Sequence, residues 1–255
     1  MAWQCTGANN TELVDNLARA GLLSTPRVID AFKQVDRRYY VPHLSDAYVD
    51  SPAYLTHGAT ISAPHMHANA IENLEPFLQP GSNVLDVGSG SGYLLGIFHA
   101  LVSPGGTVLG IEHIPALVKQ AHENLDADPA VRGVVVREGE GEEGSGRVRC
   151  VVADGREGAP RGLVPEGGWQ AIHVGAASPS LPPSLLSQLA SPGRMFIPLG
   201  SSGPGEQQAV WQVDKDARGD VTRTRLYGVR YVPLTSREAQ DPGGGGGGGG
   251  VEGEA

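Results

Sequence analysis

The stretch Val84-Leu85-Asp86-Val87-Gly88-Ser89-Gly90-Ser91-Gly92 decides the fold of this 255-residue chain. Its first four residues are mostly apolar and predict a buried strand, while the glycines predict a tight turn into a helix over residues 93–101. Only glycine lets the backbone bend sharply and also lets a ligand approach it closely. The unpaired N–H groups at the start of the helix add polar contacts for that ligand.

Short apolar runs and helical patterns alternate on the C-terminal side of this stretch. We expect strands over 107–111, 148–152, 171–174 and 194–198, helices over 115–125 and 182–189, and a closing antiparallel pair over 208–214 and 221–229. Strands that alternate with helices form a parallel sheet with helices on its faces. The sequence therefore predicts a doubly wound, mostly parallel, Rossmann-like α/β sheet.

The N-terminal third reads differently. Helices are expected over 9–20, from Thr25-Pro26 onward with the Thr25 hydroxyl as N-cap, and over 65–78. The irregular segment 50–64 is expected to be a loop or short strands, and long loops of this kind are usually functional or disordered. We therefore expect a helical cap with a substrate loop over 1–79, the sheet domain over 80–240, and a disordered glycine-rich tail over 241–255. An acidic, glycine-rich insertion over 138–146 is expected to be mobile.

Composition limits the partners. The chain has 19 Lys and Arg against 28 Asp and Glu, a net charge of −9, and no basic block. This balance argues against nucleic acid and against an anionic membrane surface. Two distant cysteines, no secretory signal and no apolar stretch long enough to cross a bilayer predict a cytoplasmic protein.

The glycine turn does not fit a dinucleotide fingerprint, because Tyr93 stands where the third glycine would be. An acid, Asp86, instead lies two residues before Gly-x-Gly-x-Gly, and this pattern resembles the first motif of class I methyltransferases that use S-adenosylmethionine. That cofactor carries a sulfonium and an ammonium group but no phosphate. Asp86 is therefore predicted to neutralise or orient the cationic end, and Gly88, Ser89 and Gly90 to form the turn that holds it.

Two more acids follow the next two strands. Glu112 ends the second strand, where both carboxylate oxygens can accept from ribose hydroxyls, and His113 is expected to pack near the adenosine. Asp154, after Ala153, is expected to accept from the adenine amino group. Three acids at the carboxyl ends of successive strands form the pattern that a nucleoside would select.

Three stretches carry a closer resemblance: 59–67, 86–92 and 172–177. With shorter matches at 1–3, 50–52, 192–194 and 231–235, they resemble the protein-L-isoaspartate O-methyltransferase family from the first residue to about Gln240. The resemblance implies a monomeric repair enzyme that acts on isoaspartyl peptides and proteins. It would transfer a methyl group to the α-carboxyl of L-isoaspartyl residues and leave S-adenosyl-L-homocysteine.

The resemblance also implies individual roles. Ser62 takes the position of the family's active-site serine, which we interpret as a binder of the acceptor carboxylate and not as a covalent nucleophile. Positions that match cofactor contacts in the family are Ala59, Thr60, Ile61, Ser62, His67, Ser91, Glu112, His113, Ala153, Asp154, Thr235 and Gln240.

Several alternatives stay open from the residues alone. The acceptor could be a small molecule or an RNA base, or the fold could serve as a catalytically silent binding module. His65 and His67 suggest a metal, but no third ligand stands near them in the sequence, so no metal site is predicted.

Overall fold

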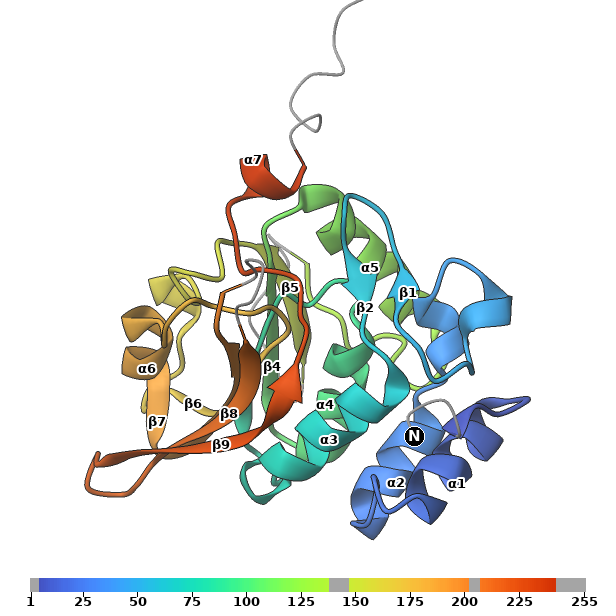
Figure 1. Cartoon of the computed structure of the whole chain (residues 1–255), viewed down its shortest axis with the longest axis horizontal. Coiled ribbons are helices and arrows are strands. Elements are labelled where there is room, and N and C mark those ends of the chain that lie inside the picture. The colour runs from blue at the N-terminus through green and yellow to red at the C-terminus, as the bar shows by residue number, and fades with distance from the viewer. Residues whose placement is uncertain (1–4, 138–146, 202–206, 242–255) are drawn as a thin grey trace, which may run out of the picture.

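A seven-stranded sheet organises the molecule, with strand order β5-β4-β3-β6-β7-β8-β9 (Figure 1). The computed structural model describes residues 5–137, 147–201 and 207–241, so the predicted insertion over 138–146 and residues 242–255 of the predicted tail lie outside the described residues. The strands are β3 (Asn83–Val87), β4 (Thr107–Glu112), β5 (Val148–Val152), β6 (Trp169–Val174), β7 (Leu189–Leu199), β8 (Gln208–Lys215) and β9 (Val221–Val229). The first five are parallel, and β8 and β9 pair antiparallel at one edge. The predicted α/β architecture is confirmed.

The chain reverses its direction of winding between β3 and β6. From β3 it proceeds outward through β4 and β5, and then returns to β6 on the other side of β3. The last residues of these two central strands lie in register, with Asp86 opposite His173. Ligands of open α/β sheets bind in the crevice beyond the carboxyl ends at such a switch point. The topology therefore directs attention to the ends of β3 and β6.

The helices cover the two faces of the sheet unequally. Alternate strand residues enter two separate cores, so Val84 packs in one and Leu85 in the other. The larger core receives the buried faces of α3 (Pro64–Leu74), α4 (Tyr93–Val102) and α5 (Pro115–Ala127). The opposite face receives the short α6 (Pro183–Gln188) and the 3-10 helix η5 (Arg161–Leu163).

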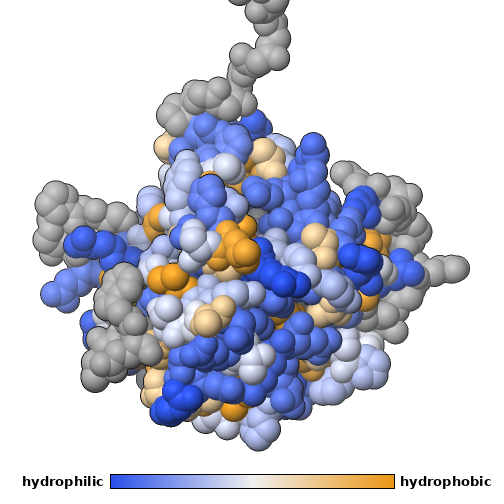
Figure 2. Space-filling view, turned by 90° about the vertical axis from the view of Figure 1, so that its right-hand side faces the viewer, coloured by the Kyte–Doolittle hydropathy of each residue, from blue (hydrophilic) through white to orange (hydrophobic). Residues whose placement is uncertain are grey.

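The N-terminal helices α1 (Asn10–Arg19) and α2 (Pro26–Gln34) share the larger core. Asn9 caps α1, because its side chain accepts from the backbone N–H of Glu12 at 3.0 Å. The predicted cap of α2 is wrong: the Thr25 hydroxyl donates to Glu72 of α3 at 2.8 Å, and the same carboxylate accepts from the Thr25 N–H at 2.9 Å. Figure 2 shows small, separate hydrophobic patches on a largely hydrophilic face on this side of the molecule.

Segment 50–64 forms a small antiparallel ribbon of β1 (Ala53–Tyr54) and β2 (Thr60–Ile61), which confirms the expected loop with short strands. Two boundaries differ from expectation by several residues. The helix expected to run to residue 78 ends at Leu74 and gives way to the 3-10 helix η4 (Glu75–Phe77), which contains Pro76. Strand β7 begins at Leu189, because Leu189 already pairs with Trp169.

Two further features complete the fold. The short helix α7 (Arg237–Gln240), at the top of Figure 1, was not predicted. The 3-10 helices η2 (Arg37–Tyr40) and η3 (Leu44–Asp46) connect α2 to the ribbon. Within the described ranges, no helix has the length and apolar composition needed to cross a membrane.

Candidate active site

The glycine turn after β3 forms the floor of the site. Gly88 and Gly90 have φ values of +77° and +49°, a left-handed conformation that other residues rarely adopt. A Cβ at Gly88 would meet nothing within 4 Å, so open space lies above the turn. At Gly155, in contrast, a Cβ would come within 2.5 Å of Val87 Cγ1, which explains how the loop after β5 approaches the floor so closely.

Glu112 borders this space at the end of β4. Its carboxylate is 6% exposed, and it accepts from the backbone N–H of Gly90 at 3.3 Å and of Ile114 at 3.1 Å. Burial raises the pKa of Glu112, and the two backbone hydrogen bonds oppose that shift. The Glu112 carboxylate is thus held in place by one backbone N–H of the glycine turn and by one of the segment that follows β4.

The cavity beside Glu112 is narrow, about 60 Å³. The predicted site residues that line it are Ala59, Thr60, Gly88, Gly90, Glu112, His113, Ala153, Thr235 and Gln240. His113 and Gln240 join across it, with His113 Nε2 2.9 Å from the amide oxygen of Gln240. Gln240 also donates to the carbonyl of His57 at 3.2 Å. Gln240 of α7 is therefore hydrogen bonded both to segment 50–64 and to the residue that follows β4.

A second small cavity, about 40 Å³, adjoins the first along the glycine turn. Asp86 lies in its wall, 2% exposed, with Oδ1 2.7 Å from Nδ1 of His173. The His173 ring stacks on Phe196 with 5.9 Å between centroids, which fixes its plane. The predicted residues that line this cavity are Thr60, Ile61, Ser62, His67, Asp86, Gly88, Ser89, Gly90 and Ser91.

A larger cavity of about 460 Å³ meets both small ones. One wall comes from residues 52–69, and the other from residues 227–232 at the end of β9. Thr60 and Gly175 border all three cavities, and Ser62 borders the large one and the cavity beside Asp86. Burial raises the pKa of the Tyr231 phenol on the opposite wall, and the Ser62 hydroxyl opposes that shift. Ser62 therefore stands at the junction between a roomy pocket and the glycine turn.

Asp154 is the one predicted site residue that does not line these cavities. It binds Arg156 of its own loop, with 2.6 Å between Oδ2 and Nη2, and the arginine lowers the pKa of the Asp154 carboxyl. Its neighbours Ala153 and Gly155 line the cavity beside Glu112. A contact from Asp154 to a ligand would have to compete with this exposed ion pair.

The comparisons with known proteins agree on one family. The family model described as "Protein-L-isoaspartate(D-aspartate) O-methyltransferase (PCMT)" matches residues 8–239. A protein-L-isoaspartate O-methyltransferase of Triticum aestivum is 42% identical over 91% of this chain and 93% of its own. One from Caenorhabditis elegans is 41% identical over 94% of this chain and 98% of its own.

The chain belongs to the protein-L-isoaspartate O-methyltransferase family. A solved structure from Plasmodium falciparum, described as such an enzyme in complex with S-adenosyl-L-homocysteine, matches with a TM-score of 0.76 and 31% sequence identity. It covers 90% of this chain and 99% of the other. The predicted family and the predicted fold are confirmed, while the roles of single site residues stay predictions.

Sequence reasoning missed three residues that hold the site of this methyltransferase together. Arg37 and Asp50 are buried beneath the substrate loop, and His173 binds Asp86. Arg37 donates to the Ser62 carbonyl, and Asp50 accepts from both the backbone N–H and Nδ1 of His65, at 3.0 and 2.7 Å. None of the three belongs to a motif from which such a contact could be predicted, although Asp50 and His173 lie in stretches that carry the family resemblance. Across the parts that the structure describes, His, Cys, Asp and Glu side chains form no group of three that could hold a metal.

Proposed function

We propose that this chain transfers a methyl group from S-adenosylmethionine to the α-carboxyl of L-isoaspartyl residues in damaged peptides and proteins. S-adenosyl-L-homocysteine is the by-product, and the methyl ester begins the repair of the residue. The observation that carries this proposal is the junction at Thr60, Ser62 and Gly175. There a cavity large enough for an amino-acid side chain meets the glycine turn and its acids.

The residues of the narrow cavities fit the cofactor chemically. The Glu112 carboxylate, held by two backbone N–H groups, suits a pair of vicinal hydroxyls such as those of ribose. The Asp86 carboxylate, bound to His173 through Oδ1, suits a cationic group at the other end of the turn. The bound cofactor supplies an electrophilic methyl group on a sulfonium. Ile61 and His67 lie on the Asp86 side, and Thr235 and Gln240 on the Glu112 side.

The acceptor is a carboxylate and is already ionised at pH 7, so the chain needs no general base. What remains is to hold the acceptor oxygen in line with the methyl group, and such alignment can supply several kcal/mol of rate acceleration. Ser62 can donate its hydroxyl hydrogen to the acceptor carboxylate, with Tyr231 beside it. Acceptor and sulfonium carry opposite charges that disappear in the transition state, so transfer is favoured when the bound acceptor and cofactor exclude water from the junction.

One assay tests the proposal. Labelled S-adenosylmethionine is supplied with a peptide that contains isoaspartate, and separately with the same peptide that contains aspartate. We expect label only in the first. Label in neither, while S-adenosyl-L-homocysteine still binds, would favour the silent binding module, and label in RNA or in a small molecule alone would favour the other acceptors.

We also propose that the protein works as a cytoplasmic monomer without nucleic-acid or membrane partners. The net charge of −9 and the two buried, unpaired cysteines, Cys5 and Cys150, support this. Light scattering after gel filtration should give a mass near 26.6 kDa. A mass near twice that value would contradict the monomer.

A further inference from the structure

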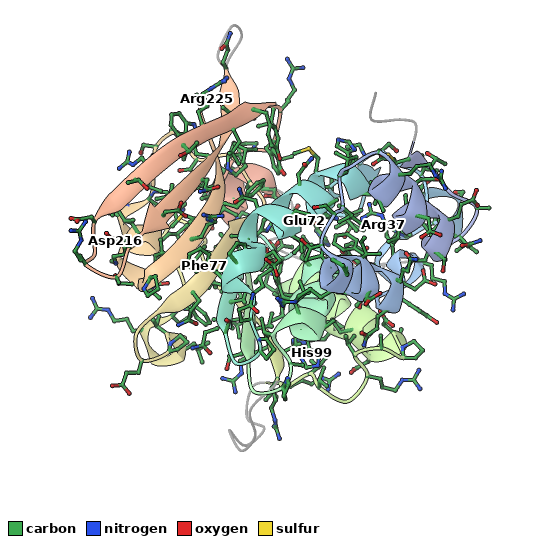
Figure 3. All side chains as sticks on the ribbon, turned by 90° about the horizontal axis from the view of Figure 1, so that it is seen from below. Arg37, Glu72, Phe77, His99, Asp216 and Arg225 are labelled. Atoms are coloured by element: carbon green, nitrogen blue, oxygen red, sulfur yellow. The ribbon has the colours of Figure 1, made fainter. Side chains whose placement is uncertain are left out.

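Arg37 is a buried cation that the proposed reaction has not yet used. It is 0% exposed, it forms no ion pair with a carboxylate of the described residues, and its Nε has no hydrogen-bond partner there. Figure 3 places it among the N-terminal helices. Burial lowers the pKa of Arg37 to about 10, with Tyr93 and Asp50 opposing the shift, so it remains charged at pH 7. A buried charge without a bound carboxylate costs stability, and its presence calls for a reason.

The contacts of Arg37 are all with the edge of the site. Nη2 donates to the carbonyl of Ser62 at 2.8 Å, and Nη1 donates to Nδ1 of His67 at 3.3 Å. The guanidinium lies 5.3 Å from the centroid of the Tyr93 ring. One cation thus holds two neighbouring parts of the site, the acceptor-side carbonyl and the His67 ring.

The contact with His67 determines which ring nitrogen carries the proton. A guanidinium has donors and no acceptor, so Nδ1 of His67 must accept, and the ring proton must reside on Nε2. A doubly protonated ring would turn an N–H toward the cation. Burial, Arg37, His173 and His65 all lower the pKa of His67, well below 6.5. The ring also packs 5.3 Å from that of Tyr93 and shares its cavity with Asp86, the one carboxylate in that wall.

We propose that Arg37 is a positioning residue that locks His67 as the neutral Nε2–H tautomer and holds the Ser62 loop against the same ring. No described residue accepts from His67 Nε2, so its proton is left for a carboxylate that enters the cavity. The ligand part of this inference rests on the proposed function. A neutral donor suits that function because a protonated imidazole would repel a sulfonium, whereas an uncharged N–H binds a carboxylate without adding positive charge.

The tautomer can be read directly from the protein without a ligand. Long-range ¹H–¹⁵N spectra of the histidine rings distinguish protonated from bare nitrogens, and we expect His67 to keep a bare Nδ1 and a protonated Nε2 between about pH 5.5 and 8.5. Half-exposed rings such as His57 give the internal comparison. A His67 ring that is protonated on Nδ1, or that titrates within this range, overturns the proposal.

Variants at Arg37 test the cause. Arg37→Met should allow both neutral tautomers of His67, so that the ¹⁵N chemical shifts of the two ring nitrogens move toward averaged values. The same variant should weaken S-adenosyl-L-homocysteine binding by roughly 10- to 100-fold. Arg37→Lys keeps a charged donor, so it should retain much of the His67 tautomer preference and much of the affinity for S-adenosyl-L-homocysteine. Arg38→Met is the matched control, since Arg38 is half-exposed in the same 3-10 helix, and it should change neither.

The outcomes separate this proposal from the proposed function. An unchanged His67 tautomer in Arg37→Met overturns the positioning role whatever the activity is. If the His67 tautomer is fixed in the unmodified protein and is no longer fixed in Arg37→Met, the positioning role of Arg37 is supported. This holds even if no methyl transfer to isoaspartate occurs. Should Arg37→Met not fold, the spectrum of the unmodified protein and that of Arg37→Lys still decide the matter.

Discussion

The two sides of this site are built in different ways. The side that we propose binds the cofactor consists of a glycine turn and an acid at the ends of adjacent parallel strands, and Glu112 is fixed there by backbone N–H groups. The side that we propose binds the acceptor is assembled from residues 52–69 and 227–232, which lie far apart in the sequence. Its loop is held from below by buried side chains, Arg37 beneath Ser62 and Asp50 at the start of α3.

This difference teaches which part of a site a sequence can predict. Backbone geometry at a strand end repeats wherever the same turn occurs, so a local pattern of glycines and acids suffices to recognise it. Side-chain contacts between distant segments depend on the whole fold. The same difference predicts that substitutions on the two sides affect different measurable quantities, and four experiments can test that separation.

The largest effect is expected on the cofactor side, at Glu112. Glu112→Gln keeps the shape of the side chain but removes the charge and one acceptor. S-adenosyl-L-homocysteine binding should weaken by about 3 kcal/mol, roughly 100-fold, because hydrogen bonds to charged groups contribute about 1.5–3 kcal/mol each. Calorimetric titration measures this, and Glu123→Gln on the exposed face of α5 is the control. An unchanged affinity would mean that Glu112 does not face the cofactor.

On the acceptor side, Ser62→Ala should act mainly on the reaction with the peptide. Loss of one hydroxyl donor should lower kcat/KM for an isoaspartyl peptide by roughly tenfold, or about 1.4 kcal/mol, while S-adenosyl-L-homocysteine binding changes less than about twofold. Steady-state kinetics and calorimetry on the same preparation give both numbers. The exposed Ser45→Ala serves as the control. Equal losses in both quantities would contradict the separation of the two sides.

A third test concerns His67, where the two sides meet. Its pKa in the folded protein is below the ordinary 6.5, so the unfolded chain binds more protons as the pH falls, and folding stability must decrease below about pH 6.5. The loss due to this residue approaches about 1.4 kcal/mol per pH unit. Urea unfolding at about pH 7, 6 and 5 should show a steeper loss for the unmodified protein than for His67→Gln. Parallel losses would show that His67 titrates normally.

The smallest effect is expected at Arg230, an exposed guanidinium in the wall of the large cavity. Among the residues that the structure describes, no Asp or Glu lines that cavity. Arg230→Ala should raise KM about threefold for isoaspartyl peptides with acidic neighbours and hardly at all for neutral ones. High salt should remove the difference, since attraction between exposed charges is screened. If the change in KM does not depend on the charge of the peptide, Arg230 contributes to binding through packing and not through its charge.

The sequence predicted more of the cofactor side than of the acceptor side. The glycine turn, Glu112 and the alternation of strands and helices follow from local patterns, and Gly88 and Gly90 adopt the left-handed conformation that such a turn requires. The position of Ser62 was predicted only through the family resemblance. Arg37, Asp50 and His173 were not predicted, because their contacts join segments that only the folded chain brings together. The same limit explains the wrong prediction for Thr25. Its hydroxyl donates to Glu72 of α3 and does not cap α2.

The most direct measurement of the central idea is a crystal structure of this protein with S-adenosyl-L-homocysteine. We expect the ribose hydroxyls against Glu112, the amino-acid end of the ligand toward Asp86, and the sulfur facing the junction at Ser62. A ligand bound elsewhere, or one whose sulfur points away from the large cavity, would contradict the account.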